Sequence, residues 1–444
     1  MIRQKYSSVR ENFMQRRYGV SLGRRYALAA ASVVLFSVLG YSQVDNNKSA
    51  LAQSNLPQAE TPSQKKTLKT DTKIIESSNK FGFKLFSELL KSDNGKKNVF
   101  ISPSSVAIAL AMTYNGASGT TQLAIAKTLE LQGVNLQEIN SSYKAALKQL
   151  LDNSDPKVQL KIANSLWANK NVSFRPDFLQ RTQDFYQAKV SNLNFQDPAA
   201  LSIINNWVKE NTNGKIDKII ENIEPSQVLF LINAIYFKGK WSKEFDKNQT
   251  AQYPFYSTPG KPKQHPMMSQ SGDYRYYESK QFQAVSLPYG KDGKFSFYIF
   301  LPKQNSNLKA FYQNLNVENW EKWITQFSKQ EGFIRLPRFK TDYDITLNDA
   351  LKTLGMEEAF SDKANFSGMG KNFAISEVKH KTFVEVNEEG TEAAAVTSVG
   401  IRTTSAVFTP QPPFRMIVDR PFFCAIRDNQ TGRVLFMGSI LDPQ

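Results

Sequence analysis

Few side chains of this 444-residue chain could carry acid–base, nucleophilic or metal chemistry. It has two histidines, His265 and His380, and one cysteine, Cys424. A single thiol excludes an intramolecular disulfide framework, and two histidines leave little scope for a zinc site or a nucleophile–histidine–acid triad. Cys424 lies in an apolar run and is predicted to be buried and inert, whereas His265, beside Pro266, is predicted to lie at the surface. The hydroxyls of Ser102–Ser105 (S-P-S-S) are interpreted as helix caps. We therefore predict no enzymatic activity, no metal and no cofactor.

The segment from Glu388 to Ser405 has a composition that is unusual for a surface connection. It follows a strand-like run, Thr382–Val386, and from Thr391 to Val399 it holds small, strand-compatible side chains and no proline. Surface loops are usually rich in Gly, Pro, Asn and Asp, which supply turn geometry. The pattern therefore indicates an exposed segment that could also become a buried strand. A short helix is the alternative, because Glu392–Val396 is rich in alanine.

The net charge of +16 is concentrated near the N-terminus. Residues 1–70 hold eleven Lys or Arg and three Asp or Glu, which gives +8, or half the total. The rest is scattered among acidic residues without a dense basic stripe, so no nucleic-acid partner is predicted. No dense basic helix indicates a heparin-like activator.

The basic start precedes an apolar run, Tyr26–Tyr41, and an A-x-A sequence at Ala50–Ala52. This layout predicts a signal peptide or membrane-targeting segment over 1–52. A twin-arginine signal at Arg24–Arg25 and an uncleaved anchor are the alternatives, although the run is shorter than the ~20 residues that span a bilayer. Residues 53–70 are polar and aperiodic and predict a disordered linker. We expect export to the extracellular space or periplasm, with membrane contact only through the N-terminal segment.

Length alone is compatible with two or three domains. Helical spacing of apolar residues predicts helices at 74–90, 106–114, 201–208 and 347–354. Strand patterns occur at 99–101, 160–168, 228–241, 295–302 and 333–339, and the stretch from 254 to 302 reads as all-β. The strand at 228–241 is almost continuously apolar, and its polar exception, Asn233, needs buried hydrogen-bond partners.

Several of these motifs, in this order, resemble those of the serpins, inhibitors that trap proteases by inserting a cleaved loop into a sheet. The matching motifs are S-P-S-S at 102–105, G-A-S-G-T-T at 116–121, the block from Asn233 to Trp241, E-E-G-T-E-A-A-A at 388–395, V-D-R-P-F at 418–422 and the strand at 429–441. The resemblance covers about 71–444 and implies one serpin domain of the exported, bacterial type. The implied α+β fold has three β-sheets, about eight or nine helices and an exposed reactive-centre loop.

The resemblance assigns roles to particular residues. The hinge of the loop would be Glu388, Glu389, Gly390, Thr391, Glu392, Ala393, Ala394, Ala395 and Val396. A polar cluster called the shutter, beneath the point where the central sheet opens, would be Ser102, Ser105, Asn233 and His380. The breach, where the loop first enters, would be Trp241 and the pair Arg338–Glu388. If partly buried, that pair would hold the sheet closed.

The implied function is suicide inhibition of serine proteases by a monomer, and small hinge residues favour it. A non-inhibitory carrier or chaperone-like serpin and a cross-class inhibitor of papain-like cysteine proteases are the alternatives. Arginine at Thr391 is expected to convert inhibitor to substrate without unfolding the protein, because a charged side chain would have to be buried early in insertion.

The position of the reactive bond follows from counting. Gly390 as the fifteenth residue before the cut gives Thr404–Ser405. Counting back from Pro421 gives Pro410–Gln411, a poor protease site, so the first count is preferred. The small Thr404 suggests elastase-like or subtilisin-like targets, and the rival bond Arg402–Thr403 suggests trypsin-like ones.

Overall fold

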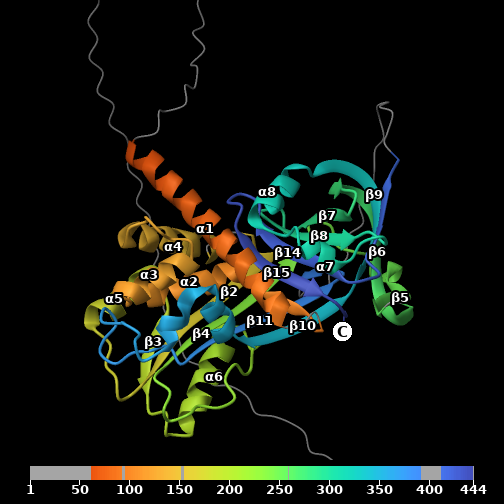
Figure 1. Cartoon of the computed structure of the whole chain (residues 1–444). Coiled ribbons are helices and arrows are strands. Elements are labelled where there is room, and N and C mark those ends of the chain that lie inside the picture. The colour runs from red at the N-terminus through yellow and green to blue at the C-terminus, as the bar shows by residue number, and fades with distance from the viewer. Residues whose placement is uncertain (1–61, 93–95, 152–154, 259, 392–411, 444) are drawn as a thin grey trace, which may run out of the picture. The chain divides into compact units, whose positions relative to one another are not determined.

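The computed structural model describes residues 62–92, 96–151, 155–258, 260–391 and 412–443 (Figure 1). The predicted signal segment 1–52, the hinge residues from Glu392 to Val396 and both candidate reactive bonds lie outside these residues. Residues 60–444 form one compact unit. Its first helix, α1, is Pro62–Ser92 and begins within the segment 53–70 that was expected to be a linker. Proline favours the first turn of a helix, and the Lys- and Gln-containing stretch that follows is compatible with helix.

A six-stranded sheet forms the centre of this unit. Its order is β10-β11-β12-β4-β2-β3. The strands are β10 Phe339–Thr346, β11 Glu377–Asn387, β12 Gly390–Thr391, β4 Leu229–Lys240, β2 Val158–Asn169 and β3 Lys189–Leu193. Strands β4 and β11 pair directly and in parallel from Phe230 to Tyr236 against Glu377 to Phe383. The short β12 is antiparallel to both and lies between them beyond that stretch.

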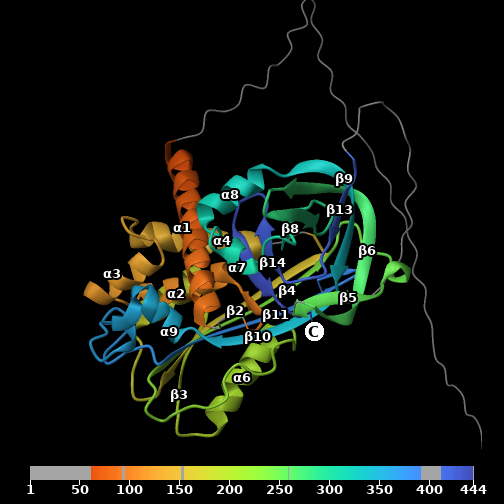
Figure 2. The same ribbon diagram turned by 45° about the vertical axis from the view of Figure 1, so that its right-hand side comes forward.

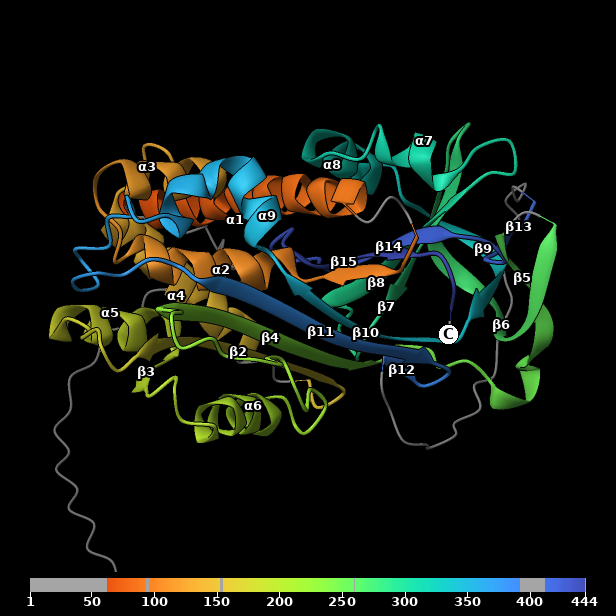
Figure 3. The same ribbon diagram turned by 60° about the horizontal axis from the view of Figure 1, so that its bottom comes forward.

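Helices cover both faces of this sheet. In Figure 3, α1 and α2 (Pro103–Tyr114) lie on one side of β4 and β11, and α6 (Ala199–Asn211) lies on the other. Every residue of α2 is buried, so its apolar side chains pack on all sides. The other α-helices of the described residues are α3 Gly119–Thr128, α4 Leu136–Leu151, α5 Pro176–Tyr186, α7 Leu308–Tyr312, α8 Val317–Thr325 and α9 Asn348–Leu351.

A nine-stranded sheet packs beside the first (Figure 2). It contains β1 Val99–Ile101, β5 Ala251–Thr258, β6 Lys261–Glu278, β7 Phe282–Pro288, β8 Phe295–Pro302, β9 Ser328–Pro337, β13 Phe414–Ile417, β14 Phe422–Asp428 and β15 Val434–Ile440. The 18-residue β6 pairs with β5, β9 and β7 along its length. It therefore joins these strands into one hydrogen-bonded network.

Two local predictions have different outcomes. Cys424 is fully buried and burial raises the pKa of its thiol, as expected of an inert cysteine. Ser102 does occupy the N-cap position of α2, but its side chain makes no capping hydrogen bond, so the interpretation of this hydroxyl as a cap was wrong. In the described part of the chain, no helix is long and apolar enough to cross a membrane.

Candidate functional site

The candidate site begins at a tight turn that connects β11 to β12. The turn residues are Glu388 and Glu389, and beyond them Gly390 pairs back with Asn387. Gly390 has a φ of +151°, which favours glycine, and a Cβ at this position would lie 2.0 Å from the carbonyl oxygen of Gly239 on β4. Only glycine therefore permits this close approach of β12 to β4.

Backbone groups at the end of β4 hold this turn in place. The indole Nε1 of Trp241 donates to the carbonyl of Asn387 at 2.9 Å, and its backbone N–H donates to the carbonyl of Glu389 at 2.9 Å. The N–H of Phe245 donates to the carbonyl of Glu388 at 2.8 Å. Trp241, which the resemblance placed at the breach, therefore contacts the turn through both its side chain and its backbone.

Glu388 forms the predicted pair with Arg338. The Arg338 Nε lies 2.7 and 2.9 Å from the two carboxylate oxygens of Glu388, and the hydroxyl of Thr250 also donates to Glu388. The Glu388 side chain is 3% exposed and that of Arg338 is 43% exposed, so the pair is partly buried. Burial opposes the charge, but the hydrogen bonds from Arg338 and Thr250 outweigh it and lower the pKa of Glu388.

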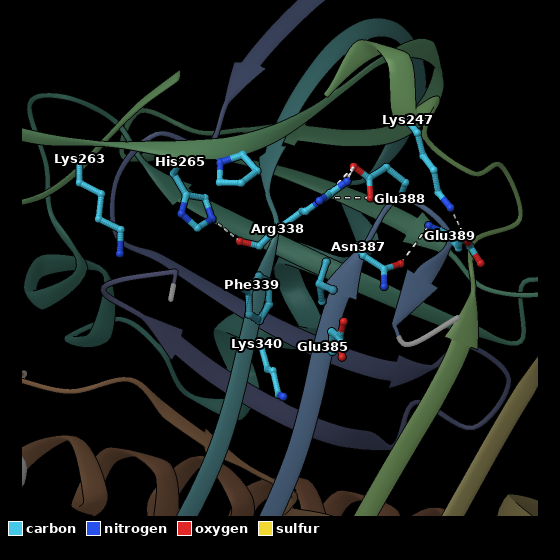
Figure 4. A pocket seen from close by; sticks show the side chains of 12 residues that line it. Lys247, Lys263, His265, Arg338, Phe339, Lys340, Glu385, Asn387, Glu388 and Glu389 are labelled. Carbon is cyan, nitrogen blue, oxygen red and sulfur yellow. Dashed lines mark hydrogen bonds and ion pairs between the residues drawn. The ribbon is translucent and has the colours of Figure 1, made fainter. Parts of the chain in front are cut away.

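Glu389 is buried as well and is paired with Lys247, whose Nζ lies 2.6 Å from its carboxylate. Figure 4 shows these groups around an open hollow of about 580 Å³, with Arg338 directed toward Glu388 and Lys247 toward Glu389. Its lining contains both basic and acidic side chains. The hollow lies where β11 turns into β12, which is the place that the resemblance names as the entry point of the loop.

The first of the predicted hinge residues are buried. Thr391 is fully buried, and its hydroxyl lies 2.7 Å from the hydroxyl of Tyr289. Tyr289 stacks on Trp241, with ring centroids 4.6 Å apart and an interplanar angle of 11°. Burial raises the pKa of Tyr289 well above its ordinary value, so the phenol stays neutral and can donate or accept.

The four predicted shutter residues lie together on α2, β4 and β11. The backbone N–H of Ser102 donates to Nε2 of His380 at 3.0 Å, and Nδ1 of His380 lies 2.6 Å from Oδ1 of Asn233. The Asn233 amide donates to the hydroxyl of Ser105 and to Oδ1 of Asn164 on β2. Ser102 therefore contributes its backbone, and its hydroxyl has no hydrogen-bond partner among the described residues.

This geometry determines the protonation of His380. Nε2 accepts from a backbone N–H, so the ring proton is on Nδ1 and is donated to Asn233. Burial lowers the pKa of His380 to about 3, because the imidazolium would be charged in a fully buried place and would lose the bond to Ser102. His380 therefore locks β11 to β4 and α2 in its neutral form.

Some of the site was not predicted. His265 is buried, and its Nε2 lies 2.5 Å from the carbonyl of Arg338, so its assignment to the surface was wrong. Its strand, β6, continues through Pro266, within the stretch that was predicted to be all-β. Thr250, Tyr289 and Asn164 were also missed. Of these, only Asn164 had a signal, because it is a polar residue in an apolar strand, as Asn233 is.

The described residues contain no group of three or more His, Cys, Asp or Glu side chains arranged to hold a metal ion. The arrangement also lacks a nucleophile beside a free base, since both histidines are engaged with protein partners. The arrangement instead positions strands relative to one another. It holds a strand end between two parallel strands and closes those strands below it.

Known proteins share this sequence and architecture. The family profile described as Serpin (serine protease inhibitor) matches residues 76–443. Serpin B8 of Homo sapiens is 35% identical over 381 residues, which cover 83% of this chain and 99% of that protein. Leukocyte elastase inhibitor of Bos taurus is 37% identical over 369 residues, covering 80% of this chain and 95% of that protein. The solved structure of the thermophilic serpin tengpin in its native state has 36% identity and a TM-score of 0.76, and the match covers 83% of this chain and 94% of that chain.

Proposed function

This chain belongs to the serpin family and has the serpin fold, and from that premise we propose that it is a suicide inhibitor of serine proteases. Members of the family are mostly protease inhibitors and not enzymes. The proposal specifies the mechanism, the bond and the class of target. The chain acts once, as a substrate whose cleavage disables the protease.

The observation that carries the mechanism is the position of β12. Its two residues already lie between β4 and β11, with Gly390 opposite Lys240 and Thr391 opposite both Gly239 and Val386. Below them β4 and β11 pair in parallel. Extending β12 would replace one parallel ladder by two antiparallel ones, in a sheet whose other described pairs among β10, β11, β4 and β2 are antiparallel. Parallel pairing is slightly less stable per residue, so the exchange is favourable.

The existing register fixes where each loop residue would arrive. Thr391 is opposite Gly239 on β4 and Val386 on β11, and both pairings are antiparallel. Six residues further along the loop, Thr397 would therefore be opposite the residues six positions earlier on those strands, Asn233 and His380. Side chains alternate between the faces of a strand, so Ala393, Ala395 and Thr397 would share the buried face of Thr391. These side chains are small, and the last has a hydroxyl that could bond the shutter amide. We infer that insertion separates the Asn233–His380 contact and substitutes Thr397 for it.

The chemistry at the loop is that of an ordinary acylation. The protease serine attacks the carbonyl carbon of Thr404, the C–N bond to Ser405 breaks, and the leaving amine takes up a proton. An ester between Thr404 and the protease remains while the Ser405 side departs. Insertion then moves the ester away from the substrate-binding surface before water hydrolyses it.

Arg402–Thr403 is the rival bond, and the similarity to a protein named leukocyte elastase inhibitor supports elastase-like targets. Export through the segment 1–52 is part of the proposal, so the target would meet the inhibitor outside the cytoplasm.

The test is incubation of residues 53–444 with an elastase, a subtilisin and a trypsin. We expect a complex that survives denaturing gel electrophoresis and a released peptide whose mass begins at Ser405. A peptide beginning at Thr403 would move the bond to Arg402. Cleavage without a complex and without a gain in thermal stability would overturn the inhibitory mechanism and favour a non-inhibitory serpin.

A further inference from the structure

Two arginines share an aromatic ring on the outer face of β9 and β13. The guanidinium carbon of Arg415 lies 4.6 Å from the centroid of Phe333, and that of Arg335 lies 5.6 Å from the same centroid. Arg335 also lies 3.5 Å from the ring centroid of Tyr253 on β5. Arg415 is directly opposite Phe333 in the parallel pairing of β13 with β9, and Arg335 follows Phe333 by two residues on the same face. The four side chains form a continuous row, which we call the arginine ladder.

In the part of the chain that the structure describes, the two arginines of the ladder have no direct carboxylate partner. Among the described residues, neither Arg335 nor Arg415 forms an ion pair, and Arg335 donates its Nε–H to the hydroxyl of Ser269 at 3.2 Å. The neighbouring Lys329, by contrast, is paired with Asp273 at 3.2 Å. Both guanidinium groups lie against the ring of Phe333, and a carboxylate of a binding partner would offset their mutual repulsion. Arg415 is exposed, so the position for such an anion faces solvent.

The aromatic rings make these cations better suited to binding than free side chains. Stacking on Phe333 and Tyr253 restricts the arginine rotamers before any partner arrives, so less entropy is lost on binding. Planar guanidinium groups match carboxylates in two-point hydrogen bonding. Arg and Tyr are also enriched in the central contacts of protein interfaces.

The position of the ladder identifies the partner. β13 starts at Phe414, nine residues after Ser405 of the proposed bond, and Gln330 on β9 donates to the carbonyl of Pro412. Nine extended residues span at most ~30 Å, whereas a protease domain is on the order of 40 Å across. A protease bound at Thr404–Ser405 therefore reaches the face of β9 and β13. Figure 3 shows β9 and β13 at the same end of the molecule as β12.

We propose that the arginine ladder binds carboxylates on the target protease beside its active-site cleft and accelerates docking. This rests on the proposed inhibitory function. The surface around the ladder also contains the acidic Asp273 and Glu331 beside Lys329 and Arg275, and such mixed charge suits a protein surface more than a uniform polyanion. A sulfated polysaccharide is therefore the competing partner that the test must separate.

The test compares charge reversal at Arg415 with the same reversal at a distant exposed lysine. Lys170 is exposed and follows the end of β2 that is remote from β12, so Lys170→Glu is the matched control. Second-order rate constants and stoichiometries of inhibition are measured with the elastase, subtilisin and trypsin above, in ~0.05 M and ~0.5 M salt. With the protease that is inhibited fastest, we expect Arg415→Glu to lower the second-order rate constant about tenfold at low salt and to leave the stoichiometry of inhibition unchanged. At high salt, most of this difference from the wild type should disappear, because salt screens the charges. Lys170→Glu should change the rate less than about twofold.

Three outcomes would overturn this inference in distinguishable ways. In the first, Arg415→Glu and Lys170→Glu have equal rates and covalent complexes still form. This outcome would disprove the docking role of the ladder and would not contradict the inhibitory function. Heparin that accelerates the wild type but not Arg415→Glu, with equal rates in its absence, assigns the ladder to a polysaccharide. Absence of any covalent complex from the wild type overturns the function and the inference together. Arg335→Gln, which keeps a polar side chain on Tyr253, provides a second variant and should lower the rate about threefold.

Discussion

The hydroxyl of Thr391 lies 2.7 Å from the hydroxyl of Tyr289, in a position from which solvent is excluded. Thr391, a residue of the predicted hinge, is thus already paired with both β4 and β11 in this structure. The turn Glu388–Glu389, the close approach of Gly390 to Gly239 and the bonds from Trp241 all fix this arrangement. Under the proposed mechanism, the protein therefore already contains the first step of loop insertion before cleavage.

This contact changes the expectation for Thr391→Arg. The sequence suggested that arginine would act only during insertion, but Thr391 is already buried, so the uncleaved form must expel the hinge or accept a buried charge. We expect a lower thermal midpoint of the uncleaved form in addition to cleavage without trapping, measured by thermal unfolding and by stoichiometry of inhibition. Tyr289→Phe, which removes one hydroxyl, should cost about 1 kcal/mol and keep inhibition. A Thr391→Arg protein with wild-type midpoint and stoichiometry would contradict the buried hinge.

The Arg338–Glu388 pair should stabilise the closed sheet. Glu388→Gln removes a buried charge that Arg338 and Thr250 both bind, and we expect a loss of about 1–3 kcal/mol, seen as a lower midpoint of urea unfolding. The matched control is Asp273→Asn, which breaks the exposed pair with Lys329 and should change stability by less than about 1 kcal/mol. Equal effects of the two variants would show that burial of Glu388 contributes nothing.

The register argument makes a prediction about two loop residues. Thr397 would arrive on the buried face opposite Asn233 and His380, whereas Glu392 would arrive on the other face, between the half-exposed Lys238 and Glu385. Thr397→Arg should therefore convert the inhibitor into a substrate, while Glu392→Arg should leave most of the trapping intact. Gel analysis of complex against cleaved product at equal concentrations distinguishes them. If both variants trapped equally well, β12 would not extend in its present register.

The buried His380 predicts an acid-sensitive fold. Its pKa is lowered to about 3 from the ordinary value of 6.5, so below pH 6.5 the unfolded chain binds a proton that the folded protein does not. The contribution of the neutral His380 to the free energy of unfolding is fully present above pH 6.5. It falls as the pH decreases toward 3, by at most ~1.4 kcal/mol per pH unit, which amounts to about 2 kcal/mol by pH 5. Urea unfolding of His380→Gln at pH 7.5 and pH 5 should show a smaller difference between the two values than the wild type does.

A control for this pH effect is His265→Gln. Burial lowers the pKa of His265 too, but its bond to the Arg338 carbonyl opposes that shift, so it contributes in the same direction and to a lesser degree. We expect His265→Gln to retain most of the pH dependence. An unchanged pH dependence in His380→Gln would mean that His380 is protonated in the folded protein.

Much of the fold was predictable because it depends on local patterns. The apolar run at 228–241 and the strand at 295–302 correspond to β4 and β8, since periodicity and β-branched or aromatic content report directly on strands. The helix at 74–90 was placed correctly but too short. The prediction relied on apolar residues at helical spacing, and the polar first turns of α1 have none. Those turns contain residues of good helix propensity, which periodicity does not detect.

The site was predictable only in part, because its contacts join distant positions. Arg338, Glu388, Asn233 and His380 came from the resemblance, and the structure pairs Arg338 with Glu388 and Asn233 with His380. Tyr289 lies 102 residues from Thr391, and Thr250 lies 138 residues from Glu388, so no local pattern could reveal either contact. Only the register of β4, β11 and β12 determines which side chains meet there.

The two-residue β12 provides a nucleus from which the proposed inserted strand could lengthen. Joining a new strand to a sheet is normally slow at its first pair, because the chain must close a loop before any hydrogen bond repays that loss of entropy. In this protein the first pairs are already formed, so the transition is elongation without nucleation and a single alignment is available to it. The first obstacle to elongation is the uppermost parallel pair, Tyr236 with Phe383, whose rings lie 6.5 Å apart. Under the proposed mechanism, insertion can outpace hydrolysis of the ester only after those two aromatic side chains have separated.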